Sequence, residues 1–181
     1  MLFADVRGYT TLTERLSAPE VPALVNRFYA AASDALLKHG GLLAQIAGDQ
    51  VMALFVPGFA GNEYRARGVD AGLAILHAVG YGYADAEPWL QVGVGIASGE
   101  QFVGNVGGGG YKDFTSVGDV TNTAARLTAS AAGGELLVDE TTYDALASAV
   151  PDAERRVLEL KGKAQPVPVY GIRAETPLTH A

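Results

Sequence analysis

The order in which apolar segments follow one another constrains the fold of this chain more than any other feature. Short apolar runs typical of strands alternate with longer stretches in which apolar residues recur every three or four positions, the spacing of one helical face. Two of the short runs flank Gly48-Asp49-Gln50, which is the pattern of a β-hairpin. The expected elements are a strand at 2–6, a helix that ends at 39, a hairpin of strands 42–47 and 51–56, a helix at about 62–79 and a strand at 90–97. Strand, helix, hairpin, helix, strand is the order of a ferredoxin-like α+β fold, so we expect an antiparallel sheet with helices on one face.

The first helix carries the clearest boundary signals. Ser17 and Glu20 have the spacing of a capping box, but Pro22 fits only a first helical turn, so we place the helix start near Pro19. His39 followed by two glycines ends it. Beyond the first five elements, the expected order is strands at 101–105 and 111–117, a helix at 119–131, a strand at 136–138, a short helix at 140–146 and strands near 157–160 and 167–172.

Composition narrows the class of protein. With 181 residues, 49% of them hydrophobic and 18% charged, the chain is long and apolar enough for one folded domain with a real core. A net charge of −7 argues against a nucleic-acid partner, which requires a basic surface. The absence of cysteine excludes disulfides, thiolate metal sites and thiol nucleophiles. The most apolar stretch, 42–59, is interrupted by Gln45, Asp49 and Gln50, so we expect no membrane span.

Two aspartates stand where a strand-like run meets a glycine turn. Asp5 lies in Phe3-Ala4-Asp5-Val6-Arg7-Gly8-Tyr9-Thr10, and Asp49 lies in the turn of the hairpin. In a ferredoxin-like fold the end of the first strand and this turn lie close together, so the two carboxylates should converge. One or two carboxylates, completed by phosphate and water, are the ligands with which proteins bind Mg²⁺. The alternative is that Asp5 is a helix cap and Asp49 an ordinary turn residue.

A third stretch adds a pair of polar residues on one expected helix. In Thr115-Ser116-Val117-Gly118-Asp119-Val120-Thr121-Asn122-Thr123-Ala124-Ala125-Arg126-Leu127, Asn122 and Arg126 are four positions apart and therefore share a helical face. Taken alone, such a pair is typical of a solvated helix surface. Together the three stretches resemble the catalytic domain of class III nucleotidyl (adenylyl/guanylyl) cyclases, and the resemblance extends over about 2–172.

This resemblance implies a metal-dependent enzyme that works as a head-to-tail homodimer with two composite sites. It implies two Mg²⁺ or Mn²⁺ ions held between Asp5 and Asp49. Asn122 would orient the ribose, and Arg126 would stabilise charge on the α-phosphate. The implied contacts to the nucleotide's phosphates come from Gly8, Tyr9 and Thr10 and from Lys161 in Leu160-Lys161-Gly162-Lys163.

The chain departs from the family pattern at the positions that recognise the base. Adenylyl cyclases usually have lysine where this chain has Gln45, and aspartate where it has Thr115, although a bacterial subgroup uses threonine. Because an amide and a hydroxyl each both donate and accept, they discriminate weakly between adenine and guanine. ATP is our first choice because of Thr115, with GTP as the alternative. Ala97 also replaces a histidine that is common in the family.

The sequence therefore predicts a cyclase catalytic domain at 1–173 and a C-terminal tail at 174–181. The expected reaction converts ATP, or alternatively GTP, to a 3′,5′-cyclic nucleotide and pyrophosphate. Gln45 and Ala97 leave open a cyclase-homology domain that binds nucleotide or dimerises without turnover, and an unrelated ferredoxin-like metal binder is a third reading. We further expect a cytoplasmic location. The chain begins almost inside its first strand, which indicates either an early start codon or a longer polypeptide with an N-terminal regulatory domain.

Overall fold

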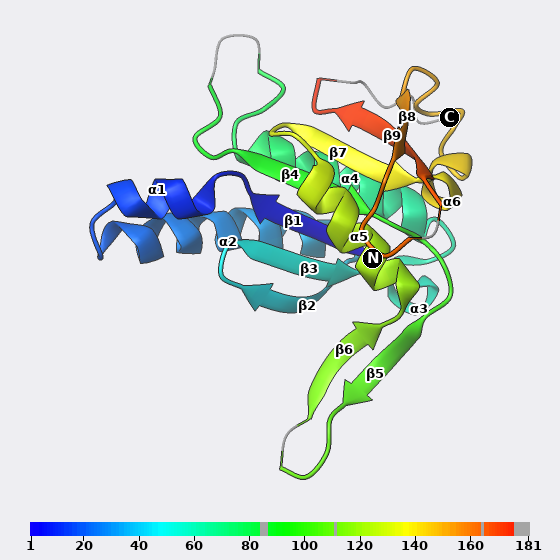
Figure 1. Cartoon of the computed structure of the whole chain (residues 1–181), viewed down its shortest axis with the longest axis horizontal. Coiled ribbons are helices and arrows are strands. Elements are labelled where there is room, and N and C mark those ends of the chain that lie inside the picture. The colour runs from blue at the N-terminus through cyan, green and yellow to red at the C-terminus, as the bar shows by residue number, and fades with distance from the viewer. Residues whose placement is uncertain (84–86, 111, 164, 176–181) are drawn as a thin grey trace.

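The computed structural model describes residues 1–83, 87–110, 112–163 and 165–175 (Figure 1). Within them, the expected elements appear in the expected order, and two short helices, at Tyr9–Arg15 and Pro57–Ala60, were not expected. The strands are β1 (Leu2–Val6), β2 (Leu42–Ala47), β3 (Gln50–Leu54), β4 (Val92–Ile96), β5 (Phe102–Val106), β6 (Asp113–Val117), β7 (Glu135–Asp139), β8 (Glu154–Leu158) and β9 (Val167–Arg173). The helices are α1 (Tyr9–Arg15), α2 (Glu20–Lys38), α3 (Pro57–Ala60), α4 (Tyr64–Ala78), α5 (Asp119–Ser130) and α6 (Glu140–Asp144). Residue 111, the expected first residue of β6, and most of the expected tail, 176–181, lie outside the described residues.

Seven of the strands form one sheet in the order β2-β3-β1-β4-β7-β9-β8. All neighbours are antiparallel except β4 and β7, which run parallel. The first strand therefore lies inside the sheet, and Asp5 lies between Gln50 on β3 and Gly93 on β4. The expected ferredoxin-like α+β layer is confirmed.

Helices α2 and α4 pack against one face of this sheet, as expected from their apolar spacing. Phe28 and Leu36 of α2, and Val69 and Leu76 of α4, are buried in the same core as the apolar side chains of β1 and β4. The start of α2 at Glu20, with Pro19 as its N-cap, agrees with the boundary signals in the sequence. In Figure 1 these two helices lie behind the sheet.

The expectation that the helices share one face is wrong for α5, which lies across the opposite face of the sheet, in front of β4 in Figure 1. The reason is the alternation of β4, Val-Gly-Val-Gly-Ile. Its valines and isoleucine face the α2–α4 core, whereas Gly93 and Gly95 face the other way. A Cβ at Gly95 would lie only 2.2 Å from the backbone nitrogen of Thr128 and 2.6 Å from the carbonyl oxygen of Ala124. The missing side chains therefore let α5 rest directly on the strand.

The remaining strands, β5 and β6, form a separate two-stranded arm that projects away from the body (Figure 1). At its base, Ser116 and Thr121 share a hydrogen bond of 3.0 Å between their hydroxyl oxygens, which ties β6 to the first turn of α5. None of the helices in the described part of the chain combines the length and apolarity needed to span a membrane.

Candidate active site

The first predicted metal ligand, Asp5, lies near the end of the central strand. Because side chains alternate along a strand, Leu2, Ala4 and Val6 enter the α2–α4 core, and Asp5 points to the opposite face, where α5 lies. Its side chain keeps 23% of its possible exposure. The carboxyl is therefore partly buried at the edge of α5, with one side open.

The second predicted ligand, Asp49, occupies the tight turn between β2 and β3, as expected. Gly48 supplies the left-handed backbone of this turn, with φ of 60°. The backbone N–H of Val6 donates to the Asp49 carbonyl oxygen at 3.0 Å, and the Tyr29 hydroxyl donates to the Gly48 carbonyl oxygen at 2.5 Å. The turn that carries Asp49 is thus fixed against the end of β1 on one side and against α2 on the other.

Electrostatics also indicate that the two aspartates lie close together. The pKa of Asp5 is raised above its usual 3.8, first because burial disfavours the charged form, and further because the negative charge of Asp49 is nearby. Arg7 opposes both effects through an ion pair and hydrogen bond to the Asp5 carboxylate. Asp5 and Asp49 thus lie on adjoining segments and are near enough to influence each other electrostatically.

The donor set fits a hard divalent cation shared with a ligand. Two carboxylates suit Mg²⁺ or Mn²⁺, which take their other ligands from phosphate and water. Among the described residues there is no cluster of three or more histidine, cysteine, aspartate or glutamate side chains that could bind a metal without help. A cation at Asp5 and Asp49 would therefore depend on a ligand such as a polyphosphate for much of its coordination.

The glycine turn that follows β1 lies beside these carboxylates. Gly8 has φ of 66° and caps α1, and the first two residues of that helix are Tyr9 and Thr10. The left-handed backbone at Gly8 turns the chain sharply out of the sheet. The three residues predicted to contact phosphate thus follow Asp5 directly.

The predicted polar pair, Asn122 and Arg126, lies on the outer side of α5. Ala124 and Leu127 of this helix are fully buried against the sheet, whereas Asn122 is exposed and Arg126 half-buried. The pair shares one helical face, as expected. That face is turned away from the strand that carries Asp5.

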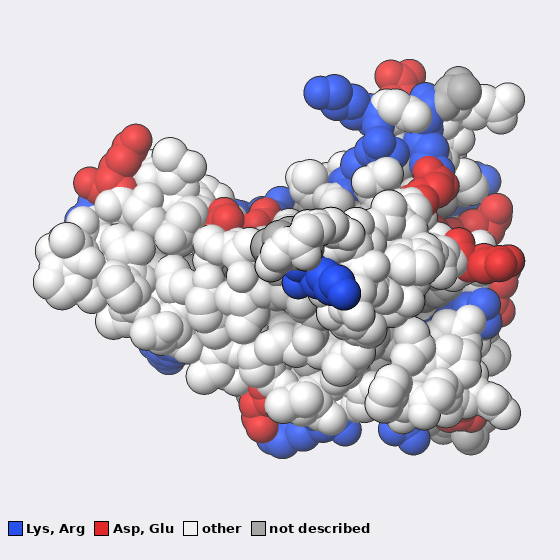
Figure 2. All heavy atoms as spheres, turned by 90° about the horizontal axis from the view of Figure 1, so that it is seen from below, with Lys and Arg blue, Asp and Glu red and all other residues white. Residues whose placement is uncertain are grey.

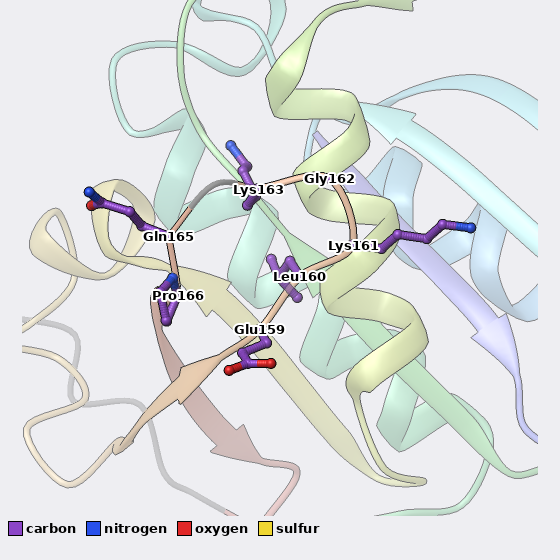
Figure 3. A pocket seen from close by; sticks show the side chains of 7 residues that line it. All are labelled: Glu159, Leu160, Lys161, Gly162, Lys163, Gln165 and Pro166. Carbon is purple, nitrogen blue, oxygen red and sulfur yellow. The ribbon is translucent and has the colours of Figure 1, made fainter.

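The predicted phosphate lysine, Lys161, belongs to the connection between β8 and β9, which borders a shallow pocket (Figure 3). A Cβ at Gly162 would lie 3.1 Å from Nη2 of Arg126, so this connection packs against the outer face of α5. Figure 3 shows Lys161 directed across α5, whereas Lys163 extends from the other side of Gly162. Lys163 forms an ion pair with Asp119, while no ion pair joins Lys161 to any described residue.

The two residues expected to read the base come from neighbouring strands. Gln45 stands opposite Met52 in the register of β2 and β3, on the face of the sheet where α5 lies, and it is exposed. Thr115 is a half-buried residue of β6, and β6 contacts β2. Each is thus accessible from the side of the sheet that carries α5.

The predicted residues therefore form two groups within one chain. The first group consists of Asp5, Asp49 and the turn at 8–10. The second group consists of Arg126 and Lys161, together with Asn122 on the same face of α5. Sequence reasoning missed two residues that hold the first group, Arg7 and Tyr29. Arg7 was detectable as the same-face neighbour of Asp5 two positions along a strand, whereas no local signal links Tyr29 to a turn nineteen residues away.

Comparison with known proteins defines the class to which this fold and these two groups belong. Residues 1–174 match the family model of the adenylate and guanylate cyclase catalytic domain. The chain belongs to this family. Its match covers nearly every element described above, including both groups of the candidate site.

Solved structures of cyclases share the fold. The guanylyl cyclase Cya2 superposes with a TM-score of 0.84 at 28% identity, covering 94% of this chain and 88% of that one. The adenylyl cyclase CyaB from P. aeruginosa gives a TM-score of 0.81 at 29% identity, covering 94% and 90%. The guanylate cyclase domain of RhGC from Catenaria anguillulae, solved with GTP, gives 0.83 at 21% identity, covering 98% and 95%, and supports the fold alone. Adenylyl and guanylyl cyclases are thus about equally similar to this chain.

Curated relatives are longer proteins. The uncharacterized protein Rv1319c of Mycobacterium tuberculosis is 37% identical over 128 residues, which is 70% of this chain and 23% of Rv1319c. The uncharacterized protein MT1359 of the same species is 31% identical over 175 residues, 92% of this chain and 31% of MT1359. The chain therefore spans about a quarter to a third of the length of these relatives.

Proposed function

We propose that this domain is a metal-dependent nucleotidyl cyclase that converts ATP, or alternatively GTP, into a 3′,5′-cyclic nucleotide and pyrophosphate. The observation that carries the proposal is the backbone hydrogen bond from Val6 to Asp49, which holds the β2–β3 turn against the end of β1 where Asp5 lies. Two carboxylates on these adjoining segments, in a family of cyclases, support a site for two Mg²⁺ or Mn²⁺ ions. Bound there, the ions would lower the pKa of the ribose 3′-hydroxyl and neutralise charge on the leaving pyrophosphate.

The chain's own residues then bind and orient the nucleotide. Gly8, Tyr9 and Thr10 approach the triphosphate from beside Asp5. From the other group, Asn122 orients the ribose, and the planar guanidinium of Arg126 donates to the α-phosphate where charge develops. Lys161, which projects over α5, neutralises the triphosphate tail.

A second copy of the chain is needed to complete the site. Asn122 and Arg126 lie on the side of α5 turned away from the strand of Asp5, so the two groups do not face each other within one chain. In a head-to-tail homodimer, each copy would supply Asp5 and Asp49 to one site and the second group to the other. The dimer thus contains two equivalent composite sites.

The β5–β6 arm supports this assembly. Its large apolar side chains are exposed, with Phe102 at 56%, Phe114 at 48% and Val117 at 52%. Viewed from the side toward which the arm projects, most of the molecular surface carries no charged side chains (Figure 2). An apolar arm on a largely uncharged face is typical of a surface that another protein covers.

Selection of the base is assigned to Gln45 and Thr115. Both side chains donate and accept hydrogen bonds, so each can pair with adenine or with guanine after a simple rotation. ATP remains the first choice because threonine at this position matches a bacterial adenylyl pattern. The discrimination between ATP and GTP is expected to be weak, on the order of a few tenfold.

A second function is favoured by one specific feature, the replacement of the usual base-binding lysine by Gln45 together with Ala97 in place of a histidine. A domain with these changes could bind nucleotide, or dimerise, without turnover. Against it stand Asp5, Asp49, Asn122, Arg126 and Lys161, which a purely regulatory domain would not need together.

Measurement of cyclic nucleotide and pyrophosphate, with ATP and GTP in parallel and Mg²⁺ or Mn²⁺ present, separates the two functions. The proposal predicts both products from wild type and a loss of at least about 100-fold in Asp49→Ala, because a metal carboxylate is missing. Asp34→Ala is the matched control, since Asp34 forms an exposed ion pair with Lys38 on the outer side of α2. Nucleotide binding without product in wild type would instead support the regulatory domain.

A further inference from the structure

Arg7 is fixed between the first metal carboxylate and the end of α5. Its Nη2 donates to Oδ2 of Asp5, and its Nε donates to the Asp5 carbonyl oxygen at 3.3 Å. Its Nη1 donates to the carbonyl oxygens of Thr128 at 3.0 Å and Ala129 at 3.4 Å. The backbone N–H of Arg7 donates to the Gln91 carbonyl oxygen at 2.7 Å. The guanidinium is thus anchored at several points and only 22% exposed.

The anchor on α5 does not depend on Asp5. Thr128 and Ala129 belong to the last turn of the helix, where the negative end of the helix dipole attracts a cation. The Arg7 side chain would therefore stay beside Asp5 even if the carboxylate bound another cation. The guanidinium therefore occupies one oxygen of the carboxylate to which a divalent cation at Asp5 and Asp49 would bind.

From this geometry we propose that Arg7 is an internal counter-ion of Asp5 that competes with the divalent cation for the carboxylate. The proposal rests on the metal site of the proposed function. A cation that binds Asp5 must displace the guanidinium hydrogen bond and then remain close to a positive charge held by α5. Divalent metal alone should therefore bind weakly, and the polyphosphate of a nucleotide, which offsets the repulsion, should bring the metal in with it.

Binding of Mn²⁺ alone, without nucleotide, tests the proposal. Free Mn²⁺ is measured by electron paramagnetic resonance during titration of the purified protein at constant pH and ionic strength. Arg7→Met should bind Mn²⁺ roughly tenfold more tightly than wild type, because it removes both the competing donor and the adjacent charge. Arg7→Lys, whose single ammonium cannot reach both Asp5 and the α5 carbonyls, should lie between the two.

Two further variants make the result specific. Arg155→Met removes the same charge from an exposed position on β8, at the far edge of the sheet, and should leave Mn²⁺ affinity unchanged. Asp49→Asn should weaken Mn²⁺ binding, because the metal site loses a carboxylate. Circular dichroism on each variant establishes that it is folded, and if Arg7→Met does not fold, Arg7→Lys carries the comparison.

The two ways in which the idea can fail are distinguishable. If Asp49→Asn weakens binding but Arg7→Met and Arg7→Lys bind Mn²⁺ no more tightly than wild type, Arg7 merely supports the site, and the counter-ion proposal is overturned while the metal site stands. If Asp49→Asn binds Mn²⁺ as wild type does, the metal site itself is misassigned, and both proposals are overturned. A residue with a merely structural role would alter thermal stability without tightening Mn²⁺ binding.

Discussion

The Asp5 carboxyl lies partly buried between a second carboxyl, Asp49, and the guanidinium of Arg7. Burial and the charge of Asp49 raise its pKa, and Arg7 only partly reverses the effect. A carboxylate in this position is destabilised in the absence of a cation, which is the condition that favours cation binding. The site thus holds unfavourable electrostatic energy that a bound metal would relieve.

This raised pKa of Asp5 predicts how stability depends on pH when metal is removed with EDTA. The folded protein holds the Asp5 proton more tightly than the unfolded chain does, so the contribution of this group to stability falls as pH rises from about 3.8 through the raised pKa. Asp5→Asn does not titrate. The stability of Asp5→Asn minus that of wild type should therefore increase as pH rises from about 3.8 to the raised pKa, and then level off. The increase should be about 1.4 kcal/mol for each pH unit by which the pKa is raised. Urea denaturation at several pH values measures the difference, and parallel curves for the two proteins would contradict the electrostatic account.

A second prediction at this scale concerns Gln45. Replacement by lysine leaves a pure donor, which can pair with the N1 acceptor of adenine but not with the N1–H of guanine. Gln45→Lys should therefore raise the ratio of kcat/KM for ATP to that for GTP by roughly tenfold. Because the measurement compares the two substrates with the same variant, a general loss of activity does not change the ratio of their kcat/KM values. An unchanged ratio would show that Gln45 does not read the base.

At the scale of elements, the site depends on helix α5 lying directly on β4. Gly93 and Gly95 make this approach possible, and the buried hydroxyl of Thr128 ties the helix to β1 by donating to the Phe3 carbonyl oxygen at 3.3 Å. The same helix presents Asn122 on its outer side and accepts Arg7 at its last turn. The position of α5 on the sheet therefore determines where both groups of the site lie.

Replacement of Gly95 by alanine should displace this helix. The new Cβ would overlap backbone atoms of Thr128 and Ala124, which cannot move without shifting α5. We expect Gly95→Ala to lower the free energy of unfolding by about 2–4 kcal/mol. Gly108→Ala is the matched control, because a Cβ there meets nothing within 4 Å, and its effect should stay within about 0.5 kcal/mol. Chemical denaturation of both variants makes the comparison, and equal stabilities would contradict the close packing of α5 on β4.

The elements also show what could be predicted from sequence. The helices α2 and α4 and the β2–β3 hairpin followed from local periodicity and turn residues, which depend on neighbours in the chain. The face on which α5 lies did not, because an apolar stripe such as that of Ala124 and Leu127 does not specify which side of a sheet it covers. For the site, the positions of Asp5 and Asp49 followed from topology. The pairing of Arg7 with carbonyl groups more than 120 residues away depends on tertiary packing and had no local signal.

For the whole molecule, the separation of the two groups matters most. One chain carries both, yet they lie on different sides of α5, and the exposed apolar arm indicates a surface that another molecule covers. The chain also spans only about a quarter to a third of the length of its mycobacterial relatives, Rv1319c and MT1359.

The central claim, that two copies share each site, is tested most directly by mixing two inactive variants. Asp49→Ala removes a metal ligand and Arg126→Ala removes a phosphate ligand, so each alone should be inactive. In a mixture, about half of the dimers would contain one copy of each, and each such dimer would have one intact site, so about a quarter of wild-type cyclase activity should return. If mixed dimers form, as detected by affinity tags on the two chains, and no activity returns, the two groups do not act across a dimer interface and the account is wrong.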